Sequence, residues 1–133
     1  MTASIDRTSP ATLPDAHAMG YSQISSCLPG TMLFISGQVA WTPEGSTPPE
    51  SLQEQTRLAM SNVIKALESK NATAANITSM RMYLVNPTQA DFYSAAPIIR
   101  EFLGEILPTF TALGVTALGG EGLRVEIEVT AVV

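Results

Sequence analysis

The C-terminal segment of the chain alternates between two kinds of side chain at every second residue. One set is apolar throughout and the other includes two glutamates: Val125, Ile127, Val129, Ala131 and Val133 against Glu126, Glu128, Thr130 and Val132. A period of two predicts a β-strand, because successive side chains of a strand point to opposite faces of a sheet. Residues 78–85 repeat the pattern, with Arg81 and Tyr83 on the side opposite the methionines. We therefore expect a sheet whose two faces differ in character.

Two further segments carry the spacing of helices. After Ser51, apolar side chains recur at steps of three and four residues until Asn71, and Ser51 and Glu54 stand at the S-x-x-E spacing of a capping box. A second such segment opens at Thr88–Asp91. The predicted order is β-β-α-β-α-β-β. It indicates an α+β domain with both helices on one face of a mixed, mostly antiparallel sheet.

The N-terminal region is less regular. Residues 1–18 contain two prolines and are expected to form an irregular arm, followed by a single domain over residues 19–133. Residues 21–27 and 32–35 have strand character and flank the turn sequence Leu28-Pro29-Gly30-Thr31, which predicts a β-hairpin. Gly37 follows the second strand, where it allows a bulge or the close approach of another group to the backbone.

The content of charged and apolar residues limits the kinds of partner that this chain can bind. Only 14% of the 133 residues are charged, against about 25% in a typical soluble domain. One layer of helices leaves the second face of the sheet uncovered, so we expect self-association. The net charge of −5 is the wrong sign for binding a nucleic-acid backbone. No apolar run approaches the roughly 20 residues that span a bilayer, and we expect a soluble, cytoplasmic protein.

The chain has one cysteine, Cys27, and one histidine, His17. These numbers allow neither an internal disulfide nor a site with several histidine ligands, which argues against zinc chemistry and Ser-His-Asp catalysis. A Cys27 and His17 dyad is the reactive alternative; a buried thiol and a surface imidazole are the ordinary one. Both residues stand in ordinary sequence contexts, which favours the second.

Five segments together resemble the YjgF/RidA family of reactive-intermediate deaminases in order and spacing. They are Gly20-Tyr21-Ser22-Gln23, Leu33-Phe34-Ile35-Ser36-Gly37-Gln38, Glu54-Gln55-Thr56-Arg57, the run from Pro108 to Leu118, and Val125-Glu126-Ile127-Glu128-Val129. The resemblance covers residues 19–133. It implies a chorismate-mutase-like α+β fold, a homotrimer whose sheets form a central barrel, and clefts between subunits. It also implies hydrolysis of enamines and imines, such as 2-aminoacrylate, to a ketone or keto acid and ammonia, with no metal or cofactor.

The resemblance assigns residues to this site. Tyr21 matches the tyrosine that lies across the substrate pocket, Gly37 beside Ser36 matches the glycine that lines it, and Glu126 matches the carboxylate that positions or activates water. The family's P-A-R-S segment, whose arginine pairs with the substrate carboxylate, reads Pro108-Thr109-Phe110-Thr111 here. Ala112 occupies the small or cysteine position two residues further on.

Phe110 changes the expected substrate, because phenylalanine offers no donor to a carboxylate whereas arginine offers a planar fork. We expect an imine other than a small 2-imino acid, in a more apolar pocket. Arg81 is the candidate replacement anchor, and the alternative for it is an ion pair with Glu126 or Glu128.

Other functions and roles stay open on the sequence alone. A trimer without catalysis that binds a small apolar metabolite or a protein is the second hypothesis. A ribonuclease is the third, and the negative charge and single histidine argue against it. Glu126 and Tyr21 each have an ordinary structural alternative. Trp41 either caps a pocket or interface or is held by local packing.

Overall fold

The computed structural model describes residues 4–133. Its elements are β1 (Ile5–Thr8), η1 (His17–Met19), β2 (Ile24–Cys27), β3 (Met32–Gln38), α1 (Leu52–Glu68), η2 (Ala74–Asn76), β4 (Ile77–Val85), α2 (Gln89–Leu103), β5 (Thr109–Val115) and β6 (Val125–Val132).

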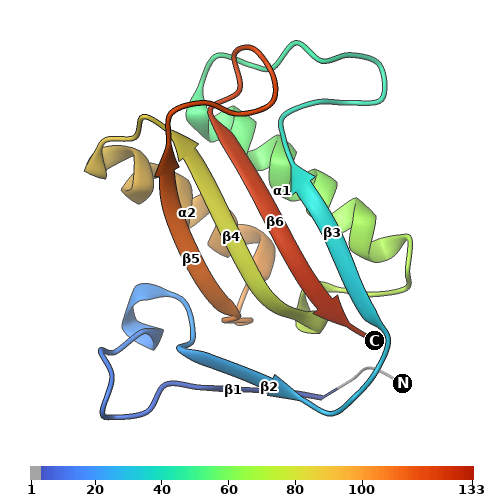
Figure 1. Cartoon of the computed structure of the whole chain (residues 1–133), viewed down its shortest axis with the longest axis vertical. Helices are drawn as coiled ribbons and strands as arrows, with labels where there is room; N and C mark the ends of the chain where they lie inside the picture. Colours follow the sequence, from blue (N-terminus) through green and yellow to red (C-terminus); the bar gives the residue numbers. More distant parts are fainter. Residues whose placement is uncertain (1–3) are drawn as a thin grey trace.

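The main sheet has four strands in the order β3-β6-β4-β5 (Figure 1). β6 lies between β3 and β4 and pairs antiparallel with both, whereas β5 pairs parallel with β4 at the edge. The two segments with the clearest alternation are therefore the two central strands. The α+β class and the mixed, mostly antiparallel sheet are confirmed.

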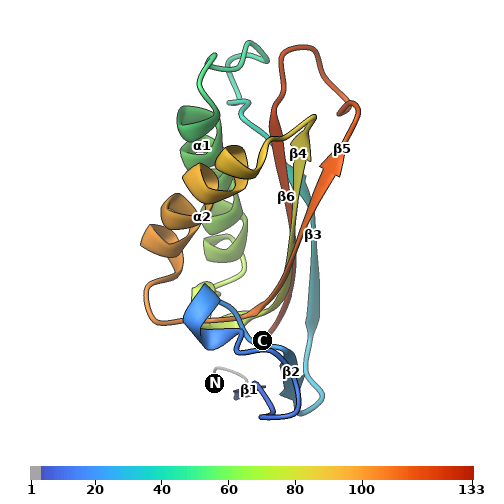
Figure 2. The same ribbon diagram turned by 90° about the vertical axis from the view of Figure 1, so that its left-hand side faces the viewer.

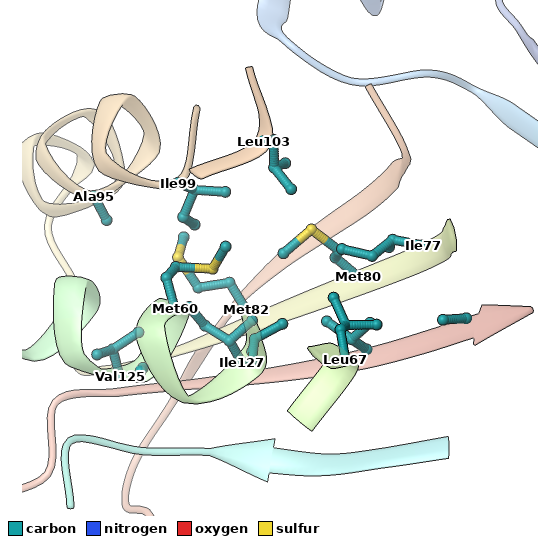
Figure 3. Close-up of a cluster of buried hydrophobic side chains, with 14 of the residues drawn as sticks. Met60, Leu67, Ile77, Met80, Met82, Ala95, Ile99, Leu103, Val125 and Ile127 are labelled. Atoms are coloured by element: carbon teal, nitrogen blue, oxygen red, sulfur yellow. The ribbon is translucent and has the colours of Figure 1, made fainter. Parts of the chain in front are cut away.

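Both helices cover the same face of this sheet, and Figure 2 shows the other face without a helix. The core forms where α1 and α2 meet β4 and β6; Met60, Ile99, Met82 and Ile127 converge there (Figure 3). Each helix begins at its predicted cap. The Ser51 hydroxyl accepts from the Glu54 N–H at 3.0 Å, and Thr88 and Asp91 cap α2 reciprocally. Within residues 4–133, no helix combines the length and apolar character needed to cross a membrane.

The uncovered face of the main sheet carries large apolar side chains. Phe34 on β3 is 79% exposed, Met32 is 44% exposed, and Leu113 on β5 is 38% exposed. Phe34 is in register with Thr130, whose side of β6 also carries Glu126 and Glu128. We name the outer face of β3, β6, β4 and β5 the open face.

The predicted irregular arm is wrong for Ile5–Thr8, which forms β1 against β2. Pro10 and Pro14 lie beyond this strand, so they do not interrupt it. The side chain of Arg7 anchors β1 by donating to the carbonyls of Ala75 and Ile77 at 2.9 and 2.8 Å. The first three residues of the predicted arm lie outside the described residues.

The predicted hairpin is also wrong. β2 pairs with β1 and begins at Ile24 rather than Tyr21, while β3 pairs with β6 at the other end of the chain. The turn sequence at residues 28–31 is a local signal, whereas β3 pairs with β6, a strand distant in sequence, and packs Leu33 and Ile35 against the core. The chain thus passes from a small two-stranded sheet into the main one.

Candidate functional site

A β-bulge brings Gly37 against Glu126. Ile35 pairs with Val129 and Gln38 pairs with Ile127, so β3 has one more residue than β6 across this interval. A Cβ placed on Gly37 would overlap the Glu126 carboxylate and lie 2.6 Å from its Cδ. Both the bulge and the close approach predicted for this glycine are present. A side chain at position 37 would displace the carboxylate.

An open hollow of about 380 Å³ adjoins this contact on the open face. It is lined by Gly37, Tyr83, Val115, Ala117, Leu118, Gly119, Glu126 and Glu128. Across residues 4–133, the Glu126 carboxylate takes part in no side-chain hydrogen bond and no ion pair. Its oxygens can therefore accept from a water or a ligand in the hollow.

Glu128 is engaged differently from Glu126. Its Oε1 accepts from Arg81 at 3.2 Å and from the Tyr83 hydroxyl at 3.3 Å. Burial, followed by the negative charge of Glu128, raises the pKa of Tyr83, so its hydroxyl stays protonated and donates. Arg81 thus forms the ion pair predicted as the alternative to a substrate anchor. Tyr83 is a lining residue that the sequence did not assign, although its strand face was identified.

Tyr21 and Phe110 lie together in a different place. The segment after η1 is fastened to the start of β5: the Ser22 N–H donates to the Pro108 carbonyl at 3.1 Å and its hydroxyl to the Leu107 carbonyl at 2.6 Å. Tyr21 and Phe110 then line a cavity of about 40 Å³. The other lining residues are Met19, Gly20, Ala96, Ile99, Arg100, Leu103 and Pro108. We name this space the helix-side cavity; most of its lining is apolar.

The hollow and the helix-side cavity lie on opposite faces of the sheet. Phe110 is in register with Met80, which is buried beneath the helices, whereas Glu126 is in register with Tyr83. Met80 and Tyr83 are separated by an odd number of positions on β4, so their side chains point in opposite directions. One chain therefore brings Gly37 to Glu126 and Tyr21 to Phe110, but it does not join the two pairs.

Ser36 and Ala112 lie outside these two linings. Ser36 is exposed at the bulge and its carbonyl accepts from the Gln38 side chain at 2.9 Å, and it borders a groove along β3 rather than the hollow. Ala112 is exposed on the edge strand β5, in register with Met82. The structure brings neither residue to Glu126 within one chain.

Three candidates remain, namely His17, Cys27 and Trp41. His17 is exposed, as predicted, and its Nε2 lies 3.2 Å from the Ser22 hydroxyl. The buried thiol predicted for Cys27 is wrong, because this residue is exposed on β2. Within residues 4–133 no hydrogen bond joins His17 to Cys27, so the dyad receives no support. The indole of Trp41 packs against Gly120, and its carbonyl accepts from Asn62 at 2.9 Å. Trp41 also lines a separate open hollow together with Pro48, Pro49 and Gly122, so it is both packed locally and placed at the edge of a pocket.

Gln55 supports the hollow and was not assigned a role from the sequence. Its buried amide donates to the carbonyls of Pro49 and Gly122 at 2.7 and 2.9 Å and accepts from the Arg124 N–H at 2.8 Å. These bonds tie α1 to the loop before β6, part of which lines the hollow. In the sequence it stands in the segment Glu54-Gln55-Thr56-Arg57 that carries the family resemblance, but that resemblance gave it no role.

Comparisons with known proteins agree on one family. The family model described as endoribonuclease L-PSP matches residues 12–133. The RutC family protein YjgH of Escherichia coli is 31% identical over 99 residues, which is 74% of each chain. A Rid-family protein of unknown function from Yersinia pestis, YyfB, superposes with a TM-score of 0.91 at 30% identity and covers 98% of this chain and 99% of its own.

A further relative carries a functional name. TdcF of Escherichia coli, which is named as a reactive intermediate deaminase, is 27% identical over 106 residues, 77% of this chain and 80% of TdcF. The structure of TdcF with bound serine superposes with a TM-score of 0.70 and 26% identity, covering 96% of this chain and 94% of TdcF. The family model's match over residues 12–133 and the fold shared with Rid-family structures identify this chain as a member of the YjgF/RidA family.

Proposed function

We propose that the protein hydrolyses a reactive imine or enamine in clefts between the subunits of a homotrimer. The observation that carries this proposal is the Glu126 carboxylate, which lies against Gly37 at the edge of a hollow and is free of side-chain partners within residues 4–133. Membership in a family that includes TdcF supports the reaction class.

Assembly would join the two halves of the site. The open face carries exposed Phe34, Met32 and Leu113, which is the kind of apolar surface that subunits bury. When three open faces pack together, the hollow beside Glu126 of one subunit meets the edge strand β5 of the next, and β5 carries Phe110. The cleft then takes its carboxylate from one subunit and its apolar cavity from another.

Glu126 acts as a proton carrier in the reaction. Its carboxylate takes a proton from water as the water oxygen bonds to the imine carbon. The electron pair of the C=N bond moves to nitrogen, and Glu126 gives the proton to that nitrogen. In the second step Glu126 takes the hydroxyl proton of the resulting carbinolamine. The C=O bond forms, the C–N bond breaks, and nitrogen receives the proton and leaves as ammonia. An enamine enters after protonation at carbon. Tyr21 contributes either a proton to the nitrogen or a wall of the cleft.

Phe110 directs the cleft away from small 2-imino acids. Their carboxylate is bonded to the imine carbon and needs a donor close to it, which a phenyl ring does not supply. The substrate we propose is a larger or more apolar imine. We do not propose the ribonuclease activity in the description of the family model, because a net charge of −5 opposes binding of a phosphate backbone.

The substitution Phe110→Arg is expected to create activity on 2-aminoacrylate, with a gain of about tenfold or more from one charge-assisted pair. An amino-acid oxidase acting on alanine would supply 2-iminopropanoate, the tautomer of 2-aminoacrylate, and an amine oxidase acting on hexylamine would supply an apolar imine. The lifetime of each would be followed by trapping as the semicarbazone. Wild-type protein should shorten the lifetime of apolar imines more than that of 2-aminoacrylate. If neither wild type nor variant shortens any imine lifetime relative to buffer, the protein is a binding module and the hydrolase proposal fails.

A further inference from the structure

We propose that Arg100 is the anion-binding residue of the helix-side cavity, and that the ligand is an imine or enamine whose carboxylate is separated from the reacting carbon by an apolar segment. The reaction named here rests on the proposed function, whereas the binding of the carboxylate does not.

Arg100 belongs to the cavity by its packing. It lies on α2 and lines the same space as Tyr21 and Phe110. A Cβ placed on Gly20 would lie 3.0 Å from Arg100 Cδ and 3.1 Å from Cζ, so the arginine side chain crosses directly over this glycine. Gly20 also has a φ of 92°, which other residues rarely adopt. The turn before Tyr21 therefore requires glycine both for its backbone and for the approach of the arginine.

Arg100 is also the one arginine left without a partner in the part of the chain from residue 4 onward. Arg57, Arg81 and Arg124 pair with carboxylates, and Arg7 donates to backbone carbonyls. No hydrogen bond or ion pair there engages the guanidinium of Arg100. An exposed guanidinium beside an apolar cavity offers a planar double donor to a carboxylate while the rest of the ligand contacts carbon.

The position of Arg100 determines the ligand class. Phe110 on β5 stands where the family's arginine is expected, next to the reacting carbon, whereas Arg100 projects from α2. Ile99, Leu103 and Phe110 line the same cavity. A ligand that places its carboxylate on Arg100 and its chain against these side chains needs an apolar spacer between the anion and the C=N group. A small 2-imino acid lacks that spacer.

Binding and reaction can be tested separately. Hexanoate and hexanol would be titrated into the protein by calorimetry, with wild type expected to bind hexanoate about tenfold more tightly. Arg100→Gln should abolish this preference and Arg100→Lys should retain part of it. Lys65→Gln, which removes an exposed positive charge from α1, should behave as wild type. The reaction would be followed with the imines that an amine oxidase forms from 6-aminohexanoate and from hexylamine. Wild type is expected to hydrolyse the imine of 6-aminohexanoate about tenfold faster than that of hexylamine, and Arg100→Gln is expected to lose this difference.

The possible outcomes distinguish the two proposals. If hexanoate binds through Arg100 but neither imine is hydrolysed, the anion site stands and the hydrolase proposal fails. If both imines are hydrolysed and Arg100→Gln changes neither their ratio nor hexanoate binding, the hydrolase proposal stands and the role of Arg100 is overturned. Equal loss of both imine activities in Arg100→Gln, with hexanoate binding unchanged, also overturns it.

Discussion

Replacing Glu126 by glutamine is expected to lower the rate of imine hydrolysis by about 10² to 10⁴, the range typical of losing a general acid–base group. Glutamine keeps the size of the side chain against Gly37 but cannot take a proton from water. The fold should therefore be preserved while the reaction is lost. Steady-state rates on an apolar imine, followed by semicarbazone trapping, would measure the effect.

The matched control is Glu68→Gln, which removes an exposed carboxylate from the end of α1. Its rate should equal that of wild type. Thermal unfolding of both variants would verify that each is folded. Unchanged activity in a folded Glu126→Gln protein would contradict the mechanism, because Glu126 is the carboxylate of the hollow that lacks a side-chain partner.

The second large effect concerns assembly. Wild-type protein is expected to sediment at three times the 14.1 kDa of one chain, and Phe34→Asp at the mass of one chain. Phe34 is 79% exposed on the open face, and burying an unpaired carboxylate there would cost several kcal/mol at each interface. Imine hydrolysis should be lost together with the trimer, because the cleft needs two subunits. Analytical ultracentrifugation at micromolar concentration would measure the masses.

Tyr93→Asp is the control for this variant. Tyr93 is an aromatic residue of similar exposure, 73%, but it lies on α2 in the helix layer. Its trimer and its activity should be retained. A wild-type protein that sediments as a single chain while hydrolysing imines would place the whole reaction within one subunit, contrary to the opposite orientation of Phe110 and Glu126.

The fold was predictable where apolar residues recur at a regular spacing, because that spacing shows which side chains are buried. The alternation of residues 125–133 predicted a strand, which the structure places inside the sheet, and the caps at Ser51 and Thr88 gave the starts of both helices. The N-terminal elements were not predictable in this way. β1 has four residues and takes its stability from pairing with β2 and from the Arg7 bonds to distant carbonyls. β3 pairs with β6 at the far end of the chain, and local sequence patterns do not identify so distant a partner.

The candidate site was predictable only in part. Gly37 predicted the close approach of another group, because a glycine inside a strand often marks such a contact. In the structure this group is the Glu126 side chain. The separation of Glu126 from Phe110 depends on strand register and sheet order, which single-residue matches do not contain. Gln55 and Arg100 resemble ordinary helix residues in the sequence. Their contacts with a distant loop and with the Gly20 turn exist only in the fold.

The central claim is that each cleft takes Glu126 from one subunit and the helix-side cavity from its neighbour. Two variants that are each expected to be inactive test it: Glu126→Gln, and Ala96→Trp, in which an indole fills the cavity from α2. They would be co-expressed with different affinity tags, and trimers carrying both tags would be purified. Every such trimer has one cleft with both wild-type halves, so activity should return to about one-third of the wild-type value. Doubly tagged trimers with no more activity than either parent would contradict a cleft shared between subunits.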